Sequence, residues 1–228
     1  MPADLLMIVP SRGRPHNIAD LWDAWSATTT GAAELLVAAD DDDPALDGYR
    51  EVCAERGIEL TVGPRLRMCP TLNKVALERA ADHYAIGFLG DDHRPRTPAF
   101  DETYLAVLAS LGGVGMVYGD DGYMGERLPT HVAMTANIIQ TLGYMVPPGL
   151  LHLWADNSWL DLGRAIDRIR YLPDVLVEHM HPIAGKAEDD HGYAEVNHPD
   201  AAERDRQAYA RWLETGFDAD VAKLRALL

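Results

Sequence analysis

The sequence predicts an α/β fold, in which one domain has a mostly parallel central sheet with helices on both faces. Short apolar runs alternate with segments of helical apolar spacing over residues 1–90. This alternation is typical of a parallel sheet, because successive parallel strands are joined by crossover helices. Polar clusters also follow several of the apolar runs directly. Those strand ends are where ligands collect in such sheets.

The expected elements follow from the spacing of apolar residues. Buried strands are expected at 5–9, 34–39, 58–62 and 84–89, and helices between them at 17–25, 49–56 and 70–82. The last of these helices would bury one face, made of Leu72, Val75, Ala76, Leu77 and Ala80. The second half is less regular, with helices expected at 100–111, 137–143, 157–169 and 201–215, and strands at 115–119 and 172–181.

No linker or repeat divides the 228 residues. We therefore expect a single domain over 1–228, which is long for one domain but able to bury a large core. Within it we expect a nucleotide-binding half at 1–99, an acceptor half at 100–182, and a lid with a C-terminal helix at 183–228.

Composition favours a cytoplasmic protein with no membrane partner. No apolar run reaches the roughly 20 residues of a membrane helix, and residues 1–10 lack the basic start of a signal peptide. Cys53 and Cys69 form no metal-binding pair and suit a reducing compartment. The formal net charge of −16 opposes a long nucleic-acid footprint. Arginines nevertheless gather in short loops, as Arg12 and Arg14 do, which suits either a small anionic ligand or solubility.

The turn at 90–93 contains Asp91, Asp92 and His93 at the end of an expected buried strand. Mg²⁺ and Mn²⁺ prefer hard oxygen ligands, and often use one or two carboxylates together with substrate phosphates. A divalent-cation site is therefore one interpretation of this turn. A solvated turn is the other, because Asp is common in turns.

A second pair of candidate metal ligands lies at the end of the expected strand 172–181. His179 and His181 are two residues apart, so on a strand they would share one face and could bind a metal together. The alternative is one packed histidine and one exposed histidine.

Two more carboxylates are candidates for ligand binding or catalysis. Asp40 ends the expected strand 34–39 and is better placed for a ligand than Asp42 and Asp43, which we expect to be solvated. Asp156 precedes an expected helix. It is either the N-cap of that helix or a general base that faces an acceptor hydroxyl.

Taken together and in this order, these residues resemble the GT-A glycosyltransferases, whose fold is Rossmann-like, and especially their family-2 type. The resemblance covers about 5–181. Its pieces are the segments IVPSRGRP at 8–15, VAAD at 37–40, PTLNK at 70–74, FLGDD at 88–92 and WAD at 154–156.

The resemblance implies a role for each matching residue. Asp156 would be the catalytic base, and Asp92 would bind Mn²⁺ or Mg²⁺ with His179 or His181 completing the metal site. Contacts to the nucleotide are implied for Pro10, Ser11, Arg12, Arg14, Asp40, Asn73 and Asp91. The chain departs from the family pattern at two positions. Gly90 replaces the first Asp of the Asp-x-Asp segment, and Ala155 replaces the Glu that usually precedes the base.

The expected function is transfer of a sugar from a nucleotide-sugar, with UDP as the expected nucleotide, to an acceptor hydroxyl. A modified DNA base of the phage type or a protein would serve as acceptor, although the charge does not favour nucleic acid. The stretch 185–197, with Lys186, Asp189 and Tyr193, is expected to form a lid. Two alternatives stay open: a sugar nucleotidyltransferase, and a non-catalytic nucleotide-sugar-binding module.

Overall fold

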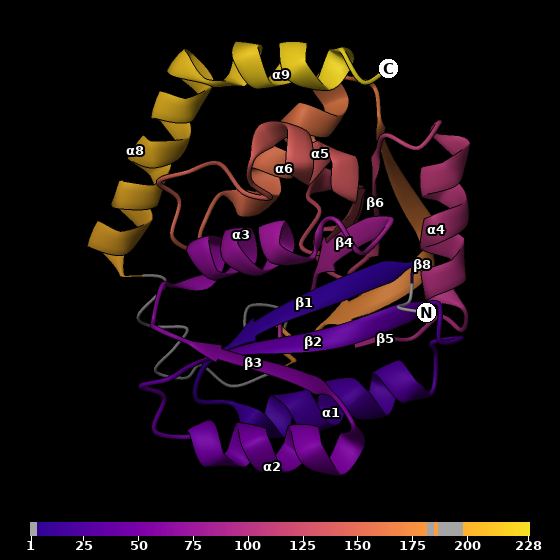
Figure 1. Cartoon of the computed structure of the whole chain (residues 1–228), viewed down its shortest axis with the longest axis vertical. Helices are drawn as coiled ribbons and strands as arrows, with labels where there is room; N and C mark the ends of the chain where they lie inside the picture. The colour runs from indigo at the N-terminus through magenta and orange to yellow at the C-terminus, as the bar shows by residue number, and fades with distance from the viewer. Residues whose placement is uncertain (1–3, 182–184, 187–197) are drawn as a thin grey trace.

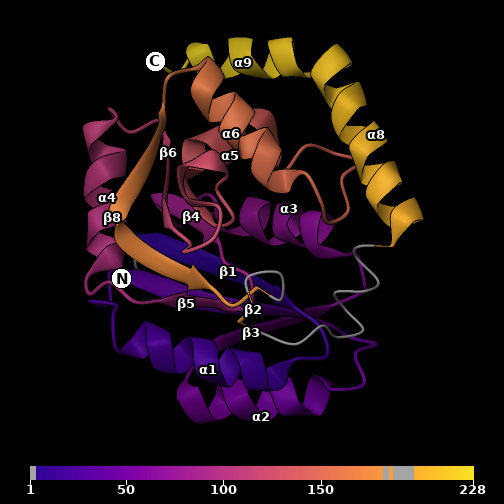
Figure 2. The same cartoon turned by 180° about the vertical axis from the view of Figure 1, so that it is seen from behind.

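The structure is a computed structural model that describes residues 4–181, 185–186 and 198–228. It contains an eight-stranded sheet in the order β3-β2-β1-β4-β7-β6-β8-β5, with helices on both faces (Figures 1 and 2). Among the described strands, β5 and β7 run antiparallel to their neighbours and the others run parallel to one another. The predicted α/β fold with a mostly parallel sheet is therefore confirmed.

The N-terminal half alternates strand and helix as predicted. Its elements are β1 (Leu5–Ser11), α1 (Pro15–Ser26), β2 (Ala33–Asp40), α2 (Leu46–Arg56), β3 (Glu59–Gly63), α3 (Met68–Arg79) and β4 (Ala85–Phe88). β1 pairs in parallel with both β2 and β4. The loops that follow these three strands consequently open at one edge of the sheet.

The second half adds the remaining strands, five more α-helices and one 3-10 helix to the described part of the chain. Its elements are β5 (His93–Pro95), α4 (Phe100–Ser110), β6 (Met116–Asp120), the short 3-10 helix η1 (Gly125–Arg127), β7 (Val132–Thr135), α5 (Ala136–Leu142), α6 (Ala155–Ala165), β8 (Ile169–His179), α8 (Pro199–Thr215) and α9 (Phe217–Arg225). β7 is antiparallel to β4 and β6, and β6 is parallel to β8. The carboxyl ends of β6 and β8 therefore lie at the same edge as those of β1 and β4. Within the described ranges, no helix is both long and apolar enough to cross a membrane.

Side chains of β1 alternate between two buried layers because successive residues of a strand face opposite sides. Leu6 and Ile8 pack with residues of α3, α5 and α6, whereas Leu5, Met7 and Val9 pack with residues of α1, α2 and α4. Figure 1 shows α1 and α2 on one side of the β1–β3 ribbons and α3 on the other. The two layers hold the central strands rigidly, so the loops at their carboxyl ends start from fixed points.

The structure differs from the expected elements in several places. α3 begins at Met68, and Leu77 is 44% exposed rather than part of its buried face. α6 begins at Ala155 and ends at Ala165, and residue 169 already belongs to β8. The strands β5 and β7 were not expected, since three and four residues are too few to give a periodic signal.

A buried carboxylate ties α8 to the loop before α6. Asp205 is 1% exposed and accepts hydrogen bonds from the main-chain N–H groups of Leu151, His152 and Leu153 at 3.3, 2.9 and 2.9 Å. Buried N–H groups need such partners, since leaving them unpaired is costly. The segment that leads into Asp156 is thus held in place from the C-terminal part of the chain.

Replacing Asp205 with Ala should lower the free energy of unfolding by about 1–3 kcal/mol, because three main-chain donors lose their acceptor. Thermal denaturation would show this as a fall in Tm of roughly 2–4 °C per kcal/mol. Arg204→Ala is the control: its side chain is 50% exposed and contacts the same carboxylate, so its loss should cost less than about 1 kcal/mol. Equal destabilisation by the two variants would contradict this role for Asp205.

Candidate metal and nucleotide site

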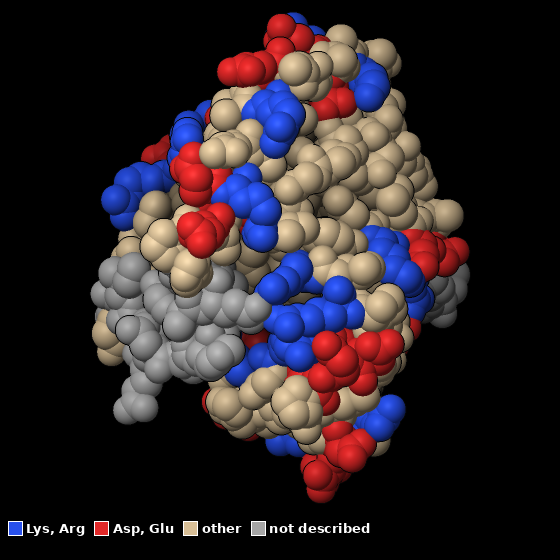
Figure 3. Space-filling model, turned by 90° about the vertical axis from the view of Figure 1, so that its left-hand side faces the viewer, with Lys and Arg blue, Asp and Glu red and all other residues tan. Residues whose placement is uncertain are grey.

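Acidic and histidine side chains gather at the carboxyl edge of the sheet. Asp40 ends β2, the turn 90–92 follows β4, Asp121 follows β6, and His179 ends β8. Because these strands are parallel, residues distant in the sequence meet at one edge. Figure 3 looks onto this side of the molecule and shows Lys and Arg side chains gathered round a hollow, with Asp and Glu beside them.

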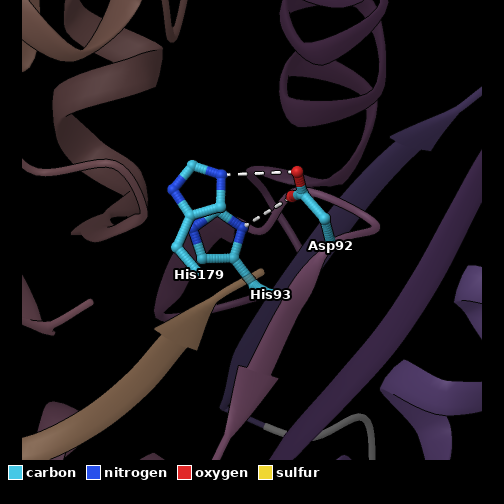
Figure 4. Close-up of side chains that lie close together, drawn as sticks. All are labelled: Asp92, His93 and His179. Atoms are coloured by element: carbon cyan, nitrogen blue, oxygen red, sulfur yellow. Dashed lines mark ion pairs between the residues drawn. The ribbon is translucent and has the colours of Figure 1, made fainter. Parts of the chain in front are cut away.

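The centre of this edge is an ion pair between Asp92 and His179. The Nε2 atom of His179 lies 3.3 Å from Asp92 Oδ2, and the main-chain N–H of Met180 donates to the carbonyl of Asp92 at 2.9 Å. The two residues come from different strand ends, as the close-up in Figure 4 shows. The predicted pairing of the turn with the distant strand is therefore present in the structure.

The pair shifts the titration of both groups. Burial alone would raise the pKa of Asp92, but the imidazoles of His179 and His93 outweigh it and hold that pKa well below its usual value. Burial alone would lower the pKa of His179, but Asp121 and Asp92 raise it to about 9. At neutral pH the pair is therefore a carboxylate and an imidazolium, and a cation that binds both side chains would displace the proton on Nε2.

His93 completes a group of three side chains that could hold a metal ion, together with Asp92 and His179. Its ring stacks on that of His179 with centroids 4.3 Å apart. However, its Nδ1 accepts a hydrogen bond from the main-chain N–H of Gly90 at 2.9 Å. The lone pair of Nδ1 is therefore used within the turn. Burial and the charge of His179 lower the pKa of His93, which keeps the ring neutral.

The positions of Asp92 and His93 explain why residue 90 is a glycine, where the Asp-x-Asp segment of the resembled family has its first Asp. A Cβ atom at Gly90 would lie 2.5 Å from Asp92 Oδ1 and 2.8 Å from His93 Nδ1. Real Cβ atoms do not approach other atoms so closely, and both of these side chains are already held by partners. The Asp92–His93 arrangement therefore excludes a side chain at position 90.

The donor set of this site fits a divalent cation. Asp92 supplies a carboxylate and His179 an imidazole, and Mn²⁺ accepts both types of ligand. Their facing atoms are 3.3 Å apart. Two ligands at about 2.1 Å from one cation span roughly this distance when they are near a right angle to each other. A cation held in this way keeps positions open for phosphate oxygens and water.

His181, the other predicted metal ligand, lies beyond the end of β8 and is not part of this group of three. Its ring packs edge-on against His179 with centroids 4.9 Å apart and stacks on Tyr123 at 5.3 Å. The expectation that both histidines share one face of a strand is wrong, because the strand ends between them.

Asp91 points toward the loop after β1. Its carboxylate accepts hydrogen bonds from Ser11 Oγ at 2.5 Å and Asn17 Nδ2 at 3.3 Å, and pairs with Arg14 at 3.4 Å. Burial and the charge of Asp92 raise the pKa of Asp91 despite the nearby arginine. The structure thus brings the predicted residues Ser11, Arg14 and Asp91 together, but Ser11 and Asp91 bind each other.

The predicted nucleotide residues Arg12 and Asp40 also meet. Arg12 Nη1 lies 2.9 Å from Asp40 Oδ2 and 2.5 Å from Asp42 Oδ1, and Arg65 Nε lies 3.9 Å from Asp40. Burial raises the pKa of Asp40. Pro10 lies in β1 beside β2 and leads the chain into this arginine-rich edge.

The prediction that Asp43 is solvated is wrong, because its side chain is buried, with 5% exposure. Its carboxylate accepts hydrogen bonds from the main-chain N–H groups of Gly13 and Ala45, both at 2.8 Å. Asp43 therefore shapes the loop after β1 from inside the protein.

Asn73, for which the resemblance implies a contact to the nucleotide, lies in the second turn of α3. Its amide group accepts from the main-chain N–H groups of Met145 and Val146 at 2.8 and 2.7 Å and donates to the carbonyl of Val146 at 2.8 Å. These bonds use the amide oxygen and one of the two amide N–H groups, and they hold the segment after α5 in place.

Asp156 is the second residue of α6. The N-cap is Trp154, so the alternative in which Asp156 caps the helix is wrong. Burial raises the pKa of Asp156 to about 6. Asp156 lines a pocket of about 400 Å³ whose opposite wall is formed by α8, with Ala202 and Arg206. A carboxyl group in a pocket, with a pKa this close to neutral pH, is suited to exchange a proton with a bound molecule.

Sequence reasoning missed Asp121. Asp120 and Asp121 both follow the strand expected at 115–119, so the rule for strand ends would have pointed to this pair of residues. The expected lid at 185–197, including Asp189 and Tyr193, lies outside the described residues except for Gly185 and Lys186.

Replacing Gly90 with Ala should disturb the site itself. The added Cβ must displace Asp92 or His93, so we expect a loss of about 1–3 kcal/mol in unfolding free energy and weaker Mn²⁺ binding by titration. Gly63→Ala is the matched control, because a Cβ at Gly63 meets no atom within 4 Å. Unchanged Mn²⁺ binding in Gly90→Ala would show that Asp92 can move without cost.

No known protein-family profile and no curated protein sequence matches this chain. Solved structures do match it. TarS of Staphylococcus aureus superposes with a TM-score of 0.58 at 15% identity, over 95% of this chain and 44% of TarS. The present chain thus spans less than half of the TarS chain that it matches.

Two further structures are similar over more of their own length. The mannosyltransferase PcManGT of Pyrobaculum calidifontis, in complex with GDP-Man and Mn²⁺, has a TM-score of 0.56 and 15% identity over 99% of this chain and 74% of its own. Glucosyl-3-phosphoglycerate synthase of Mycobacterium tuberculosis, with Mn²⁺, UDP-glucose and phosphoglyceric acid, has a TM-score of 0.62 and 12% identity over 91% and 80%. At these identities the likeness establishes the fold, and the chain has the GT-A fold.

Proposed function

We propose that this protein is a glycosyltransferase that moves a sugar from a nucleoside-diphosphate sugar to an acceptor hydroxyl. A divalent cation, Mn²⁺ first, would be held by Asp92 and His179. The observation that carries the proposal is the meeting of these two side chains at the carboxyl edge, at 3.3 Å. Asp156 lines a pocket and is within electrostatic reach of His179. The GT-A proteins above that were solved with Mn²⁺ and a sugar nucleotide support it by analogy.

The donor would lie across the carboxyl ends of β1, β2 and β4. Arg12 and Asp40 form the part of this edge that would face the nucleoside, and Arg14 the part nearer to the turn at Asp91. When bound, the cation would offset the charge that develops on the leaving nucleoside diphosphate. The arginines would add to this stabilisation of negative charge.

Asp156 would act on the acceptor. Its raised pKa lets it take a proton near neutral pH. The acceptor hydroxyl would give its proton to the Asp156 carboxylate as its oxygen bonds to the anomeric carbon. The bond from that carbon to the phosphate oxygen would break in the same step, and the electron pair would leave with the nucleoside diphosphate. α8 would form one wall of the acceptor pocket.

A thermal-shift panel of nucleoside diphosphates, each with and without Mn²⁺, tests the donor half of the proposal. One nucleotide should raise Tm in a Mn²⁺-dependent way, because a ligand that binds only the folded state stabilises it by RT ln(1 + [L]/Kd). Asp92→Asn should lose the Mn²⁺-dependent part of the shift. Asp82→Asn, which removes an exposed carboxylate outside the site, should keep it. A flat response of the native protein to every nucleotide would refute the donor assignment.

The pH dependence of kcat tests the role of Asp156. With a pKa of about 6, the Asp156 carboxyl group is mostly protonated below that pH and mostly ionised above it. Activity should therefore rise about tenfold per pH unit below 6 and level off above it. Asp156→Asn should lower kcat by roughly 10²–10⁴-fold.

Glu203→Gln is the control for this profile. Glu203 lines the same pocket, but Arg206 and Gln207 lower its pKa to about 2, so its removal should leave the acid limb unchanged. An acid limb that persists in Asp156→Asn would assign the base to another residue. Release of inorganic pyrophosphate from a nucleoside triphosphate and a sugar phosphate would instead indicate a nucleotidyltransferase.

A further inference from the structure

We propose that Asp121 is a positioning residue for the metal site: it orients the imidazole of His179 so that Nε2 faces the cation. This inference rests on the proposed function, since it assumes that Asp92 and His179 hold a cation. It concerns a residue that contacts neither the donor nor the acceptor in that proposal and that lies on another strand end, after β6.

Asp121 is among the most buried charged residues of the described chain, with 1% exposure. Its Oδ1 atom accepts hydrogen bonds from the main-chain N–H groups of Tyr123, Met124 and Gly125 at 2.9, 2.6 and 2.9 Å. Its Oδ2 atom accepts from Thr130 Oγ1 at 2.8 Å. The carboxylate therefore has one oxygen devoted to the loop and a second oxygen with remaining capacity to accept.

That second oxygen faces His179. Oδ2 lies 3.9 Å from His179 Nδ1, and the main-chain N–H of His179 donates to the carbonyl of Asp121 at 2.9 Å. Nδ1 is buried and has no hydrogen-bond partner among the described residues. The imidazole thus lies between two carboxylates, with Nδ1 toward Asp121 and Nε2 toward Asp92 at 3.3 Å.

A metal-binding histidine commonly directs its second ring nitrogen at a carboxylate, which decides where the ring proton resides. In the ion pair with Asp92 both ring nitrogens carry a proton. A cation that binds Nε2 would displace the proton there, and the remaining proton would stay on Nδ1, directed at Asp121. Stacking on His93 and the edge contact with His181 limit rotation of the ring about its own axis. Stacking does not decide which ring nitrogen of His179 keeps the proton. Asp121 does, because its carboxylate favours a proton on Nδ1.

The hydrogen bonds to the loop do not by themselves explain why the buried residue at position 121 is an aspartate. An asparagine would satisfy the three N–H groups of the loop through its own Oδ1. The side-chain atom at the place of Oδ2 must be an acceptor if it is to accept from Thr130 and also face the Nδ1–H of His179. A carboxylate is the side chain that offers acceptors at both positions.

Asp121→Asn separates the two roles, because it keeps the acceptor for the loop and replaces the acceptor that faces His179. We expect the Kd for Mn²⁺, measured by electron paramagnetic resonance of free Mn²⁺ without nucleotide, to rise by about 10–100-fold. Thr130→Val is the matched control: it removes the other partner of the same oxygen but leaves His179 untouched, so the Kd should stay unchanged.

A double-mutant cycle with His179→Ala decides how Asp121 acts. If Asp121 acts through His179, Asp121→Asn should have no further effect on Mn²⁺ binding in the His179→Ala background. The same fold-change in both backgrounds would mean that Asp121 supports the site only through the loop, and would overturn the proposal. An unchanged Kd in Asp121→Asn alone would overturn it as well.

A third measurement needs no variant and covers the case in which Asp121→Asn does not fold. In the Zn²⁺ complex of the native protein, which is diamagnetic, ¹⁵N shifts should show the His179 proton on Nδ1 and the metal on Nε2. The reverse assignment overturns the proposal for Asp121 and leaves the metal site in place. Absence of any Mn²⁺ or Zn²⁺ binding by the native protein overturns the metal half of the proposed function itself, and the positioning role with it.

Discussion

The contact between the turn after β4 and the end of β8 is the constraint on which the site depends. A main-chain hydrogen bond joins Met180 to Asp92, and the short strand β5 pairs with β8 in a register that sets His93 opposite His179. These bonds hold two adjacent carboxylates in opposite roles. Asp91 faces inward to the loop after β1 with a raised pKa, whereas Asp92 faces β8 with a lowered one.

Much of this arrangement could be predicted from the sequence, because it follows from strand ends. The apolar runs identified the parallel strands, and polar residues that follow them share one edge in any such sheet. The resemblance to the GT-A glycosyltransferases then implied that His179 or His181 completes the metal site with Asp92. What could not be predicted depends on contacts that leave no periodic pattern. The pairing of β5 with β8, and the bonds between Asn73 and the segment at 145–146, are of this kind.

Buried aspartates recur as organisers of loops. Several accept two or more main-chain N–H bonds from a neighbouring segment: Asp43, Asp101, Asp121 and Asp205. Such residues are indistinguishable in sequence from solvated ones, which is why Asp43 was assigned to the surface. They also change how the net charge of −16 should be understood. Part of the acidic count lies inside the protein, so its surface is less acidic than composition implies.

The pairing of His93 with His179 also has a consequence for the order of folding. The two residues are far apart in the chain, and loops of that length close slowly compared with local helices and hairpins. The strands β1, β2 and β4 with their helices can pack through contacts that are local in the chain. The imidazole of His179 reaches Asp92 only after β8 has paired with β6. During synthesis, the arginine-rich edge would exist before the proposed metal site is complete.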